Sequence, residues 1–380
     1  MSSHVQKLTT RQRRALKFEY DLSTGHAKQY QNEIQEAIIK KIPELFVQTQ
    51  ILTQAEIQEK FAEKFFNLAG QKSYKKLKPP LYHFSCSMSI EVVVNYLRTK
   101  NKQVGLIHPT FDNIGDILKR HNINLFPIEE EFLTNIDKLA LTLPSTVDTL
   151  FLVCPNNPTG QELTREQFAK IVELCQKRHL LLILDFSFRF LSDFKVWDQY
   201  ELLLKSGIEF VAIEDTGKTW PTMELKIGIL AAPEPIYTSL EVITDDMLLN
   251  VSPVIFLLLT KYIEAENKEA LSIENVVNNN REILRTALQS TPLTVFNERS
   301  RVSVEWVKLP EGWQSSHLSW WMEERGIHLL PGSPFFWNDY QKGEGYIRFA
   351  LARPPSLFQK AISELQRLIN EYQPLTNNNE

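Results

Sequence analysis

Glycine is scarce in this chain, and cysteine is scarcer still. Glycine accounts for 13 of the 380 residues, about half the usual share of ~7%. This shortage excludes collagen-like, low-complexity and glycine-looped repeat architectures. The three cysteines, Cys86, Cys154 and Cys175, are too few to cross-link a chain of this length, and their spacing matches no zinc-binding pattern. We therefore expect buried cysteines that act as small apolar side chains in a reducing compartment.

The sequence also lacks a long apolar run and a strong excess of charge. No stretch of ~18 uninterrupted apolar residues occurs, so we expect no membrane-spanning helix. Basic side chains are frequent in residues 1–20, but no apolar segment follows them, which is unlike a secretion signal. The formal net charge of −4 gives no general attraction for nucleic acid. These absences predict a cytoplasmic protein with neither a membrane nor a nucleic acid as its partner.

Strand-like and helix-like segments alternate from about residue 50 to 235. The segments 149–155, 180–186 and 210–215 are largely apolar runs, which is typical of strands buried on both faces. The alternation predicts an α/β fold with a mostly parallel, doubly wound sheet. After residue 240, helical segments precede strand-like ones at 302–309 and 346–352, which predicts a smaller α+β domain.

Three polar side chains lie at or just after the ends of these strands, where open α/β sheets bind ligands. Asn157 follows the first strand, Asp185 lies at the end of the second, and Lys218 follows the third. Pyridoxal phosphate (PLP) requires a lysine for a Schiff base and a carboxylate that keeps its ring nitrogen protonated. It also requires a polar group at its phenolic oxygen. The three residues together predict a PLP site.

The same residues lie in motifs that resemble the fold type I, aspartate aminotransferase-like PLP enzymes, over roughly residues 40 to 355. In the run PNNPTG, the resemblance implies that Asn157 contacts the phenolic oxygen and that the Asn157–Pro158 bond is cis. Asp185 matches the aspartate at the ring nitrogen, and Lys218 matches the Schiff-base lysine. Lys226 falls where the group usually has a phosphate-binding arginine.

The cofactor's phosphate and ring have further expected partners. Ser85, Cys86 and Ser87 precede a predicted helix at 89–100, where hydroxyls and backbone N–H groups suit a phosphate. Phe111 lies where the family has an aromatic ring stacked on the cofactor.

Two more positions concern the substrate carboxylate and the phenolic oxygen. Arg348, in the run YIRFALA, matches the arginine that binds a substrate α-carboxylate. Phe188 replaces the family's usual tyrosine, which leaves Ser187 available to reach the phenolic oxygen.

The runs EDTGKTWPT, HPTFDN and DFSFR, with LTTRQ and STGHA near the N-terminus, resemble a narrower set of PLP enzymes. These act on L-arginine in pathways to cyclic arginine derivatives, and include oxygen-dependent arginine oxidases/hydroxylases and an L-enduracididine cyclase. The resemblance implies a mobile N-terminal lid with His26 over the cofactor. Residues 1–45 would form the lid, 46–240 the large PLP-binding domain and 241–380 the small domain, and the group's sites between subunits imply a homodimer.

The resemblance also implies substrate contacts in the lid and beside the lysine. These are Thr9, Gln12 and Thr24, together with Asp215, which either meets a guanidinium or caps a turn. The arginine oxidases have glutamate where this chain has Gln12. Losing a carboxylate aimed at a guanidinium removes a charge-assisted hydrogen bond, which favours a changed reaction.

We therefore predict the cyclodehydration of γ-hydroxy-L-arginine to L-enduracididine, with Lys218 and His26 moving protons and Asp185 supporting the cofactor ring. An oxygen-dependent arginine oxidase/hydroxylase is the first alternative, and a class I/II aminotransferase is the second. A non-catalytic PLP-binding regulator is a third, but regulators of this fold carry a DNA-binding domain for which the chain has no spare residues.

Overall fold

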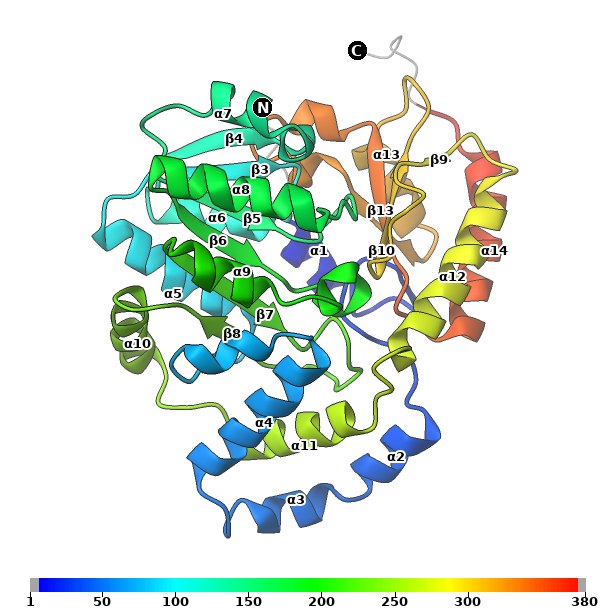
Figure 1. Cartoon of the computed structure of the whole chain (residues 1–380). Helices are drawn as coiled ribbons and strands as arrows, with labels where there is room; N and C mark the ends of the chain where they lie inside the picture. The colour runs from blue at the N-terminus through cyan, green and yellow to red at the C-terminus, as the bar shows by residue number, and fades with distance from the viewer. Residues whose placement is uncertain (1–6, 375–380) are drawn as a thin grey trace.

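A seven-stranded sheet forms the centre of the larger part of the molecule (Figure 1). The computed structural model describes residues 7–374. In spatial order the strands are β2 (Leu81–His83), β8 (Gly228–Ala231), β7 (Phe210–Asp215), β6 (Leu181–Asp185), β5 (Thr149–Val153), β3 (Val104–His108) and β4 (Leu125–Glu129). Strands β3 to β7 run parallel, and β8 is antiparallel to both of its neighbours. The prediction of a mostly parallel sheet is confirmed.

Helices cover both faces of this sheet. They are α4 (Gln54–Leu68), α5 (Cys86–Thr99), α6 (Asp112–Arg120), α7 (Ile136–Thr142), α8 (Arg165–Arg178), α9 (Gln199–Ser206) and α10 (Ile236–Met247). In Figure 1, α8 and α9 lie in front of the sheet and α5 and α6 lie behind it. Every residue of β3, β5, β6 and β7 is buried, because helices pack on both faces.

Side-chain caps set the starts of helices α4 and α5. Thr53 and Glu56 exchange hydrogen bonds in a capping box, so α4 begins at the N-cap that the sequence indicates. Helix α5 begins at Cys86 rather than at the expected residue 89, because the Ser85 hydroxyl caps it by accepting a bond from the Met88 N–H at 3.3 Å.

A four-stranded antiparallel sheet forms the centre of the second part. Its spatial order is β12 (Leu330–Pro331), β13 (Tyr346–Ala350), β10 (Val304–Lys308) and β9 (Thr294–Val295). The two strands predicted after residue 300 are its central pair. Its helices are α12 (Ser272–Leu288), α13 (Ser315–Glu323) and α14 (Pro355–Glu371), and α12 and α14 lie side by side in Figure 1.

The N-terminal segment connects the two parts. Helix α1 (Leu8–Ala15) lies between the two sheets in Figure 1, and β1 (Tyr20–Asp21) pairs with β11 (Ile327–His328). Helices α2 (Glu33–Ile39) and α3 (Ile42–Gln48) follow and lie near α11 (Pro253–Glu264). Helix α11 packs on α4, where the rings of Phe256 and Phe61 meet edge-on with centroids 5.3 Å apart. The domain boundary at residue 241 stays a prediction.

Short 3-10 helices occupy several connections. They are η1 (Lys72–Lys76), η2 (Glu130–Thr134), η3 (Arg189–Leu191), η4 (Asp193–Lys195), η5 (Ser333–Phe335) and η6 (Tyr340–Gly343). Between residues 7 and 374, no helix has both the length and the apolar character needed to cross a membrane.

Candidate active site

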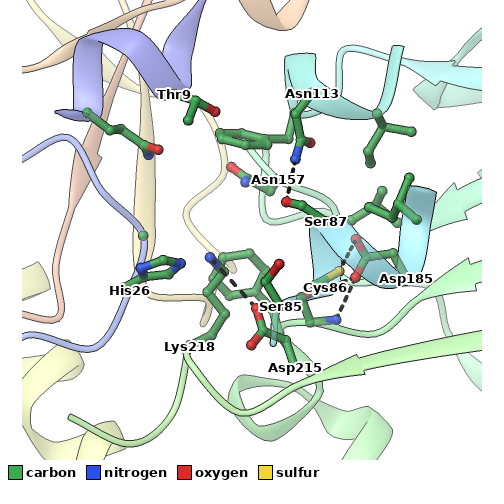
Figure 2. Close-up of a pocket in the computed structure, with 18 of the residues that line it drawn as sticks. Thr9, His26, Ser85, Cys86, Ser87, Asn113, Asn157, Asp185, Asp215 and Lys218 are labelled. Atoms are coloured by element: carbon green, nitrogen blue, oxygen red, sulfur yellow. Dashed lines mark hydrogen bonds and ion pairs between the residues drawn. The ribbon is translucent and has the colours of Figure 1, made fainter. Parts of the chain in front are cut away.

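A cavity of about 240 Å³ lies at the carboxyl ends of β5, β6 and β7 (Figure 2). Most of the residues expected at a PLP site line it. They are Thr9, Gln12, His26, Ser85, Cys86, Ser87, Phe111, Asn157, Asp185, Ser187, Asp215, Lys218, Lys226 and Arg348. Thr24 does not line it; the Thr24 side chain is buried, and its carbonyl accepts a bond from Arg353 Nη2 at 2.7 Å.

Lys218 follows β7 and extends into the cavity. Its Nζ lies 4.0 Å from Asp215 Oδ2, and its side chain is 18% exposed. Burial lowers the pKa of Lys218, against the opposing effect of the Asp215 carboxylate. A lower pKa increases the fraction of neutral amine, which is the form that attacks a carbonyl carbon. The position suits a lysine that binds PLP covalently.

Asp215 uses its two carboxylate oxygens differently. Oδ1 accepts a bond from the Gly217 N–H at 2.7 Å, so it caps the turn that leads to Lys218. Oδ2 is the oxygen that faces Lys218. Asp215 therefore caps the turn, as one of the two expected roles required. Its second oxygen remains directed toward Lys218 in the cavity.

Ser187 and Cys86 orient the buried carboxylate of Asp185. Oδ1 accepts bonds from the Ser187 N–H at 2.8 Å and from the Ser187 hydroxyl at 2.5 Å, whereas Oδ2 has the Cys86 thiol 3.7 Å away. We expected Ser187 to reach the phenolic oxygen of the cofactor. Its hydroxyl bonds to Asp185 instead, because that carboxylate lies two residues before it. Burial raises the pKa of Asp185, against these bonds, and a protonated ring nitrogen beside it would lower that pKa.

The first turn of α5 forms the wall expected to hold the phosphate. The Met88 N–H is already bonded to Ser85, whereas the N–H groups of Cys86 and Ser87, the first two of the helix, have no acceptor within it and suit an anion. Gly228 of β8 lies directly against this turn, where a Cβ would come within 2.5 Å of the Ser85 carbonyl carbon. Ser87 Oγ accepts a bond from Asn113 Nδ2 at 2.9 Å (Figure 2).

Arg348 of β13 is buried and bonded to the loop after β5. Its Nη1 donates to Asn157 Oδ1 at 2.8 Å, and its Nη2 donates to the Ser23 carbonyl. Its Nε has no hydrogen-bond partner among the described residues. Burial lowers the pKa of Arg348 to about 9. A buried guanidinium with a free donor is ready for a carboxylate.

The expected cis bond at Asn157–Pro158 is wrong. The cis bonds nearby are Cys154–Pro155 and His108–Pro109. After Pro155 the backbone closes on itself, since the Asn156 N–H donates to the Gln161 carbonyl and the Gly160 N–H donates to the Asn156 carbonyl, both at 2.9 Å. This turn accommodates Pro158 in the trans form.

Helix α1 carries Thr9 and Gln12 to the cavity. The Leu8 N–H, at the helix N-terminus, donates to the buried Asp112 Oδ2 at 2.7 Å, a favourable place for a carboxylate. Leu8 itself is buried in an apolar cluster with Trp306, Leu330, Phe335 and Phe336. Gln12 Nε2 donates to the Ser23 carbonyl at 3.4 Å. Helix α1 therefore covers the cavity, and its mobility stays a prediction.

His26 lies at the edge of the cavity, facing Lys218 (Figure 2). Its Nδ1 is 2.8 Å from Glu224 Oε1, and its Nε2 is 3.2 Å from Lys226 Nζ. Lys226, expected at the phosphate, also donates to Glu224 Oε2. Burial lowers the pKa of His26 to about 4, and the charge of Lys218 adds to this effect. The ring is therefore neutral at neutral pH.

Sequence reasoning missed Asn113 and Glu224. Asn113 belongs to the run HPTFDN, whose resemblance to the arginine enzymes was a usable signal. Glu224 had no such signal, because its side chain reaches His26 only through a turn in which Met223 and Glu224 have positive φ angles of 50° and 71°.

The model of the aminotransferase class I and II family matches residues 19–365. The chain belongs to this family. Its structure is similar to that of MppP soaked with the product 2-ketoarginine, with a TM-score of 0.86 and 31% identity over 92% of this chain and 99% of that one. The aspartate aminotransferase of Thermus thermophilus with maleate shares the fold, with a TM-score of 0.78 and 14% identity over 96% of this chain and 97% of that one.

The curated relatives are more distant. LL-diaminopimelate aminotransferase 2 of Trichormus variabilis is 26% identical over 248 residues, which are 63% of this chain and 60% of that enzyme. The LL-diaminopimelate aminotransferase 2 of Nostoc sp. matches to the same extent. The chain thus spans about 60% of the length of these relatives.

PLP is the cofactor of this family, and the cavity residues fit it. Lys218 would bind its aldehyde carbon, Asp185 Oδ2 would face its ring nitrogen, and the first turn of α5 would hold its phosphate. The close approach allowed by Gly228 shapes the phosphate end of the cavity. When bound, PLP withdraws electrons from the α-carbon of an attached amino acid.

Proposed function

We propose that the chain converts γ-hydroxy-L-arginine to the cyclic amino acid L-enduracididine. The observation that carries this proposal is a cavity with charges of both signs under helix α1: the buried Arg348 on one side and the buried Asp215 beside Lys218. An amino acid with a carboxylate and a guanidinium matches such a cavity. The likeness to MppP, whose structure was soaked with 2-ketoarginine, supports a guanidino substrate.

Arg348 and Asp215 would orient the two ends of the substrate. The unpartnered Nε of Arg348 would donate to one oxygen of the α-carboxylate, and Nη2, on the same edge of the guanidinium, would donate to the other in place of its bond to the Ser23 carbonyl. Asp215 Oδ2, which is not used in the turn, would accept a guanidinium N–H. Holding both ends brings the guanidine close to the γ-carbon, and such proximity lowers the barrier to ring closure.

Lys218 and His26 would move the protons. The lowered pKa of Lys218 suits a base that would take the α-proton of the substrate. His26 is neutral and faces Lys218 (Figure 2), so it would accept or return a proton on the β-carbon.

The overall reaction breaks the γ-carbon to oxygen bond and forms a bond between a guanidine nitrogen and that carbon. One water leaves and no electrons are gained or lost, so the reaction consumes no oxygen. Gln12 supports a reaction other than arginine oxidation, because it places a neutral amide where the arginine oxidases have a carboxylate.

Oxygen-dependent oxidation of L-arginine is the second candidate, and the likeness to MppP and its product 2-ketoarginine favours it. The two reactions separate cleanly. The holoenzyme is mixed with L-arginine or with γ-hydroxy-L-arginine, oxygen is followed with an electrode, and products are identified by mass.

We expect a product lighter than γ-hydroxy-L-arginine by one water, and no oxygen consumption. Oxygen consumption and a keto acid from plain L-arginine would contradict the cyclase and support the oxidase. A product that forms only when a keto acid is added would indicate an aminotransferase. If neither compound changes the visible spectrum of the bound cofactor, the substrate class is wrong.

A further inference from the structure

The loop that follows Lys218 contains two strained residues. Met223 and Glu224 have φ angles of 50° and 71°, and a side chain with a Cβ is strained in this conformation. The other non-glycine residues with positive φ in the described chain are Asn101, Asn122 and His179, types that tolerate it better. Strain of this kind persists where surrounding contacts hold it, and it often marks a functional site.

The strained backbone brings the Glu224 carboxylate between His26 and Lys226. Oε1 lies 2.8 Å from His26 Nδ1, and Oε2 accepts a bond from Lys226 Nζ. The Lys226 N–H donates to the Glu224 carbonyl at 2.9 Å, which closes the turn. The Glu224 carboxylate thus contacts the imidazole of His26 and the ammonium group of Lys226, one through each oxygen.

These contacts select one tautomer of His26. A carboxylate only accepts hydrogen bonds, so the neutral ring must carry its proton on Nδ1. The Nε2 lone pair then accepts a bond from Lys226 Nζ, which only donates, at 3.2 Å. The same Nζ lies farther from Nδ1, at 3.5 Å, where Glu224 Oε1 is the nearer partner.

The backbone of His26 is held separately from its ring. The N–H of Ala27 donates to the Gly217 carbonyl at 3.0 Å, and Arg353 Nη1 donates to the His26 carbonyl at 3.2 Å. The backbone around His26 therefore does not depend on Glu224. The contact with Glu224 instead orients the His26 imidazole ring.

We propose that Glu224 is a positioning residue that fixes His26 as the Nδ1–H tautomer, so that Nε2, which here accepts a bond from Lys226 Nζ, is the basic nitrogen of the ring. The inference rests on the proton-transfer role of His26 in the proposed function. A proton accepted at Nε2 is returned from the same atom, so no oxidant or further reactant is needed.

The first test reads the tautomer directly and needs no substrate. The holoenzyme is labelled with ¹⁵N-histidine, His26→Asn assigns the signal, and two-dimensional spectra report which ring nitrogen carries the proton. We expect Nδ1–H in the parent chain. Glu224 is 57% exposed, so Glu224→Ala should raise the share of Nε2–H by about fivefold.

The control is Glu201→Gln, which removes an exposed ion pair with Lys205 far along the chain and should leave the His26 signal unchanged. An unchanged tautomer in Glu224→Ala, or Nε2–H in the parent chain, would overturn the proposal. Far-ultraviolet circular dichroism confirms that each variant is folded.

The second test uses turnover. With the best substrate found, Glu224→Ala should lower kcat about tenfold, as expected for weakened acid–base catalysis, with KM within twofold. A change confined to KM would assign Glu224 to substrate binding and overturn the positioning role. If γ-hydroxy-L-arginine is not a substrate, the tautomer result still stands, so failure of the proposed function is distinguishable from failure of this inference.

Discussion

Gly228 has no Cβ, and this allows strand β8 to pass close to the helix turn that we propose to hold the phosphate. Strand β8 passes so close to the first turn of α5 that a Cβ at this position would overlap the Ser85 backbone. Backbone cannot move aside as a flexible side chain can. The few glycines of the chain therefore include one whose absent Cβ lets β8 pass close to the first turn of α5.

Gly228→Ala should weaken PLP binding at least tenfold, because the added methyl group would displace the helix turn that we propose to hold the phosphate. Titration of the apoenzyme with PLP, followed by visible absorbance, measures the dissociation constant. Gly345→Ala is the control, since a Cβ there meets nothing within 4 Å. Equal affinities in the two variants would contradict this assignment of the phosphate.

Helix α1 is attached to the rest of the molecule through Leu8, at its N-terminal end. Its N-terminal Leu8 N–H bonds to Asp112, and the Leu8 side chain enters the apolar cluster with Trp306. Burial raises the pKa of Asp112 to about 7. Nearby, Lys7 and Asp116 form an ion pair, with Nζ 2.9 Å from Oδ2. Both of these side chains are more exposed than that of Asp112.

Asp112→Ala should loosen α1, because it removes a buried hydrogen bond to a carboxylate, an interaction of about 1.5–3 kcal/mol. Limited trypsin digestion at Arg11 and Arg13, followed by mass spectrometry, should run about tenfold faster. Asp116→Ala removes only the exposed ion pair, which contributes little, and should stay within twofold of the parent. Similar rates for the two variants would exclude Asp112 as the attachment point.

Asp21 ties the N-terminal segment to the body of the molecule. Its Oδ2 lies 2.9 Å from Lys28 Nζ and 3.8 Å from Arg353 Nη2. Burial alone would raise the pKa of Asp21, but Arg353 and Lys28 outweigh it and hold the pKa at about 2. The folded-state pKa is below the unfolded value, so this stabilisation is present above about pH 4 and is lost as the pH falls toward 2.

Asp21→Asn should therefore lower the free energy of unfolding by about 2 kcal/mol at pH 7. The difference from the parent chain should shrink between pH 4 and 2. Urea unfolding at a series of pH values measures it, with Glu201→Gln as the exposed-carboxylate control. A difference that stays constant with pH would show that the charge of Asp21 is not responsible.

We also propose that the whole molecule is a homodimer. The resemblance to fold type I PLP enzymes, whose sites lie between subunits, implies this assembly, and large apolar side chains such as Leu249 and Ile51 are 93% and 75% exposed. Light scattering on the eluted holoenzyme should give twice the chain mass of 44.2 kDa. A mass of one chain at micromolar concentration would contradict the dimer.

Most residues of the proposed cofactor site could be predicted to lie together because they stand at strand ends. Asn157, Asp185 and Lys218 each lie beside a continuous apolar run, and parallel strands bring such residues to one edge of a sheet. The capping box at Thr53 was equally local. The antiparallel direction of β8 and the existence of the short strand β2 were not predicted. A short apolar run such as residues 228–231 does not indicate in which direction a strand runs or with which strand it pairs.

The sequence by itself determined the α/β fold and brought out the cavity-lining residues that we propose to contact PLP, because apolar periodicity and strand-end chemistry are properties of neighbouring positions. Only the tertiary structure decided that Ser187 bonds to Asp185, that Thr24 does not line the cavity, and that Pro158 is trans. The contacts of Leu8 with Asp112 and of His26 with Glu224 join residues 104 and 198 positions apart. Such contacts depend on how separate elements pack and on strained backbone at Glu224, which no local pattern of side chains encodes.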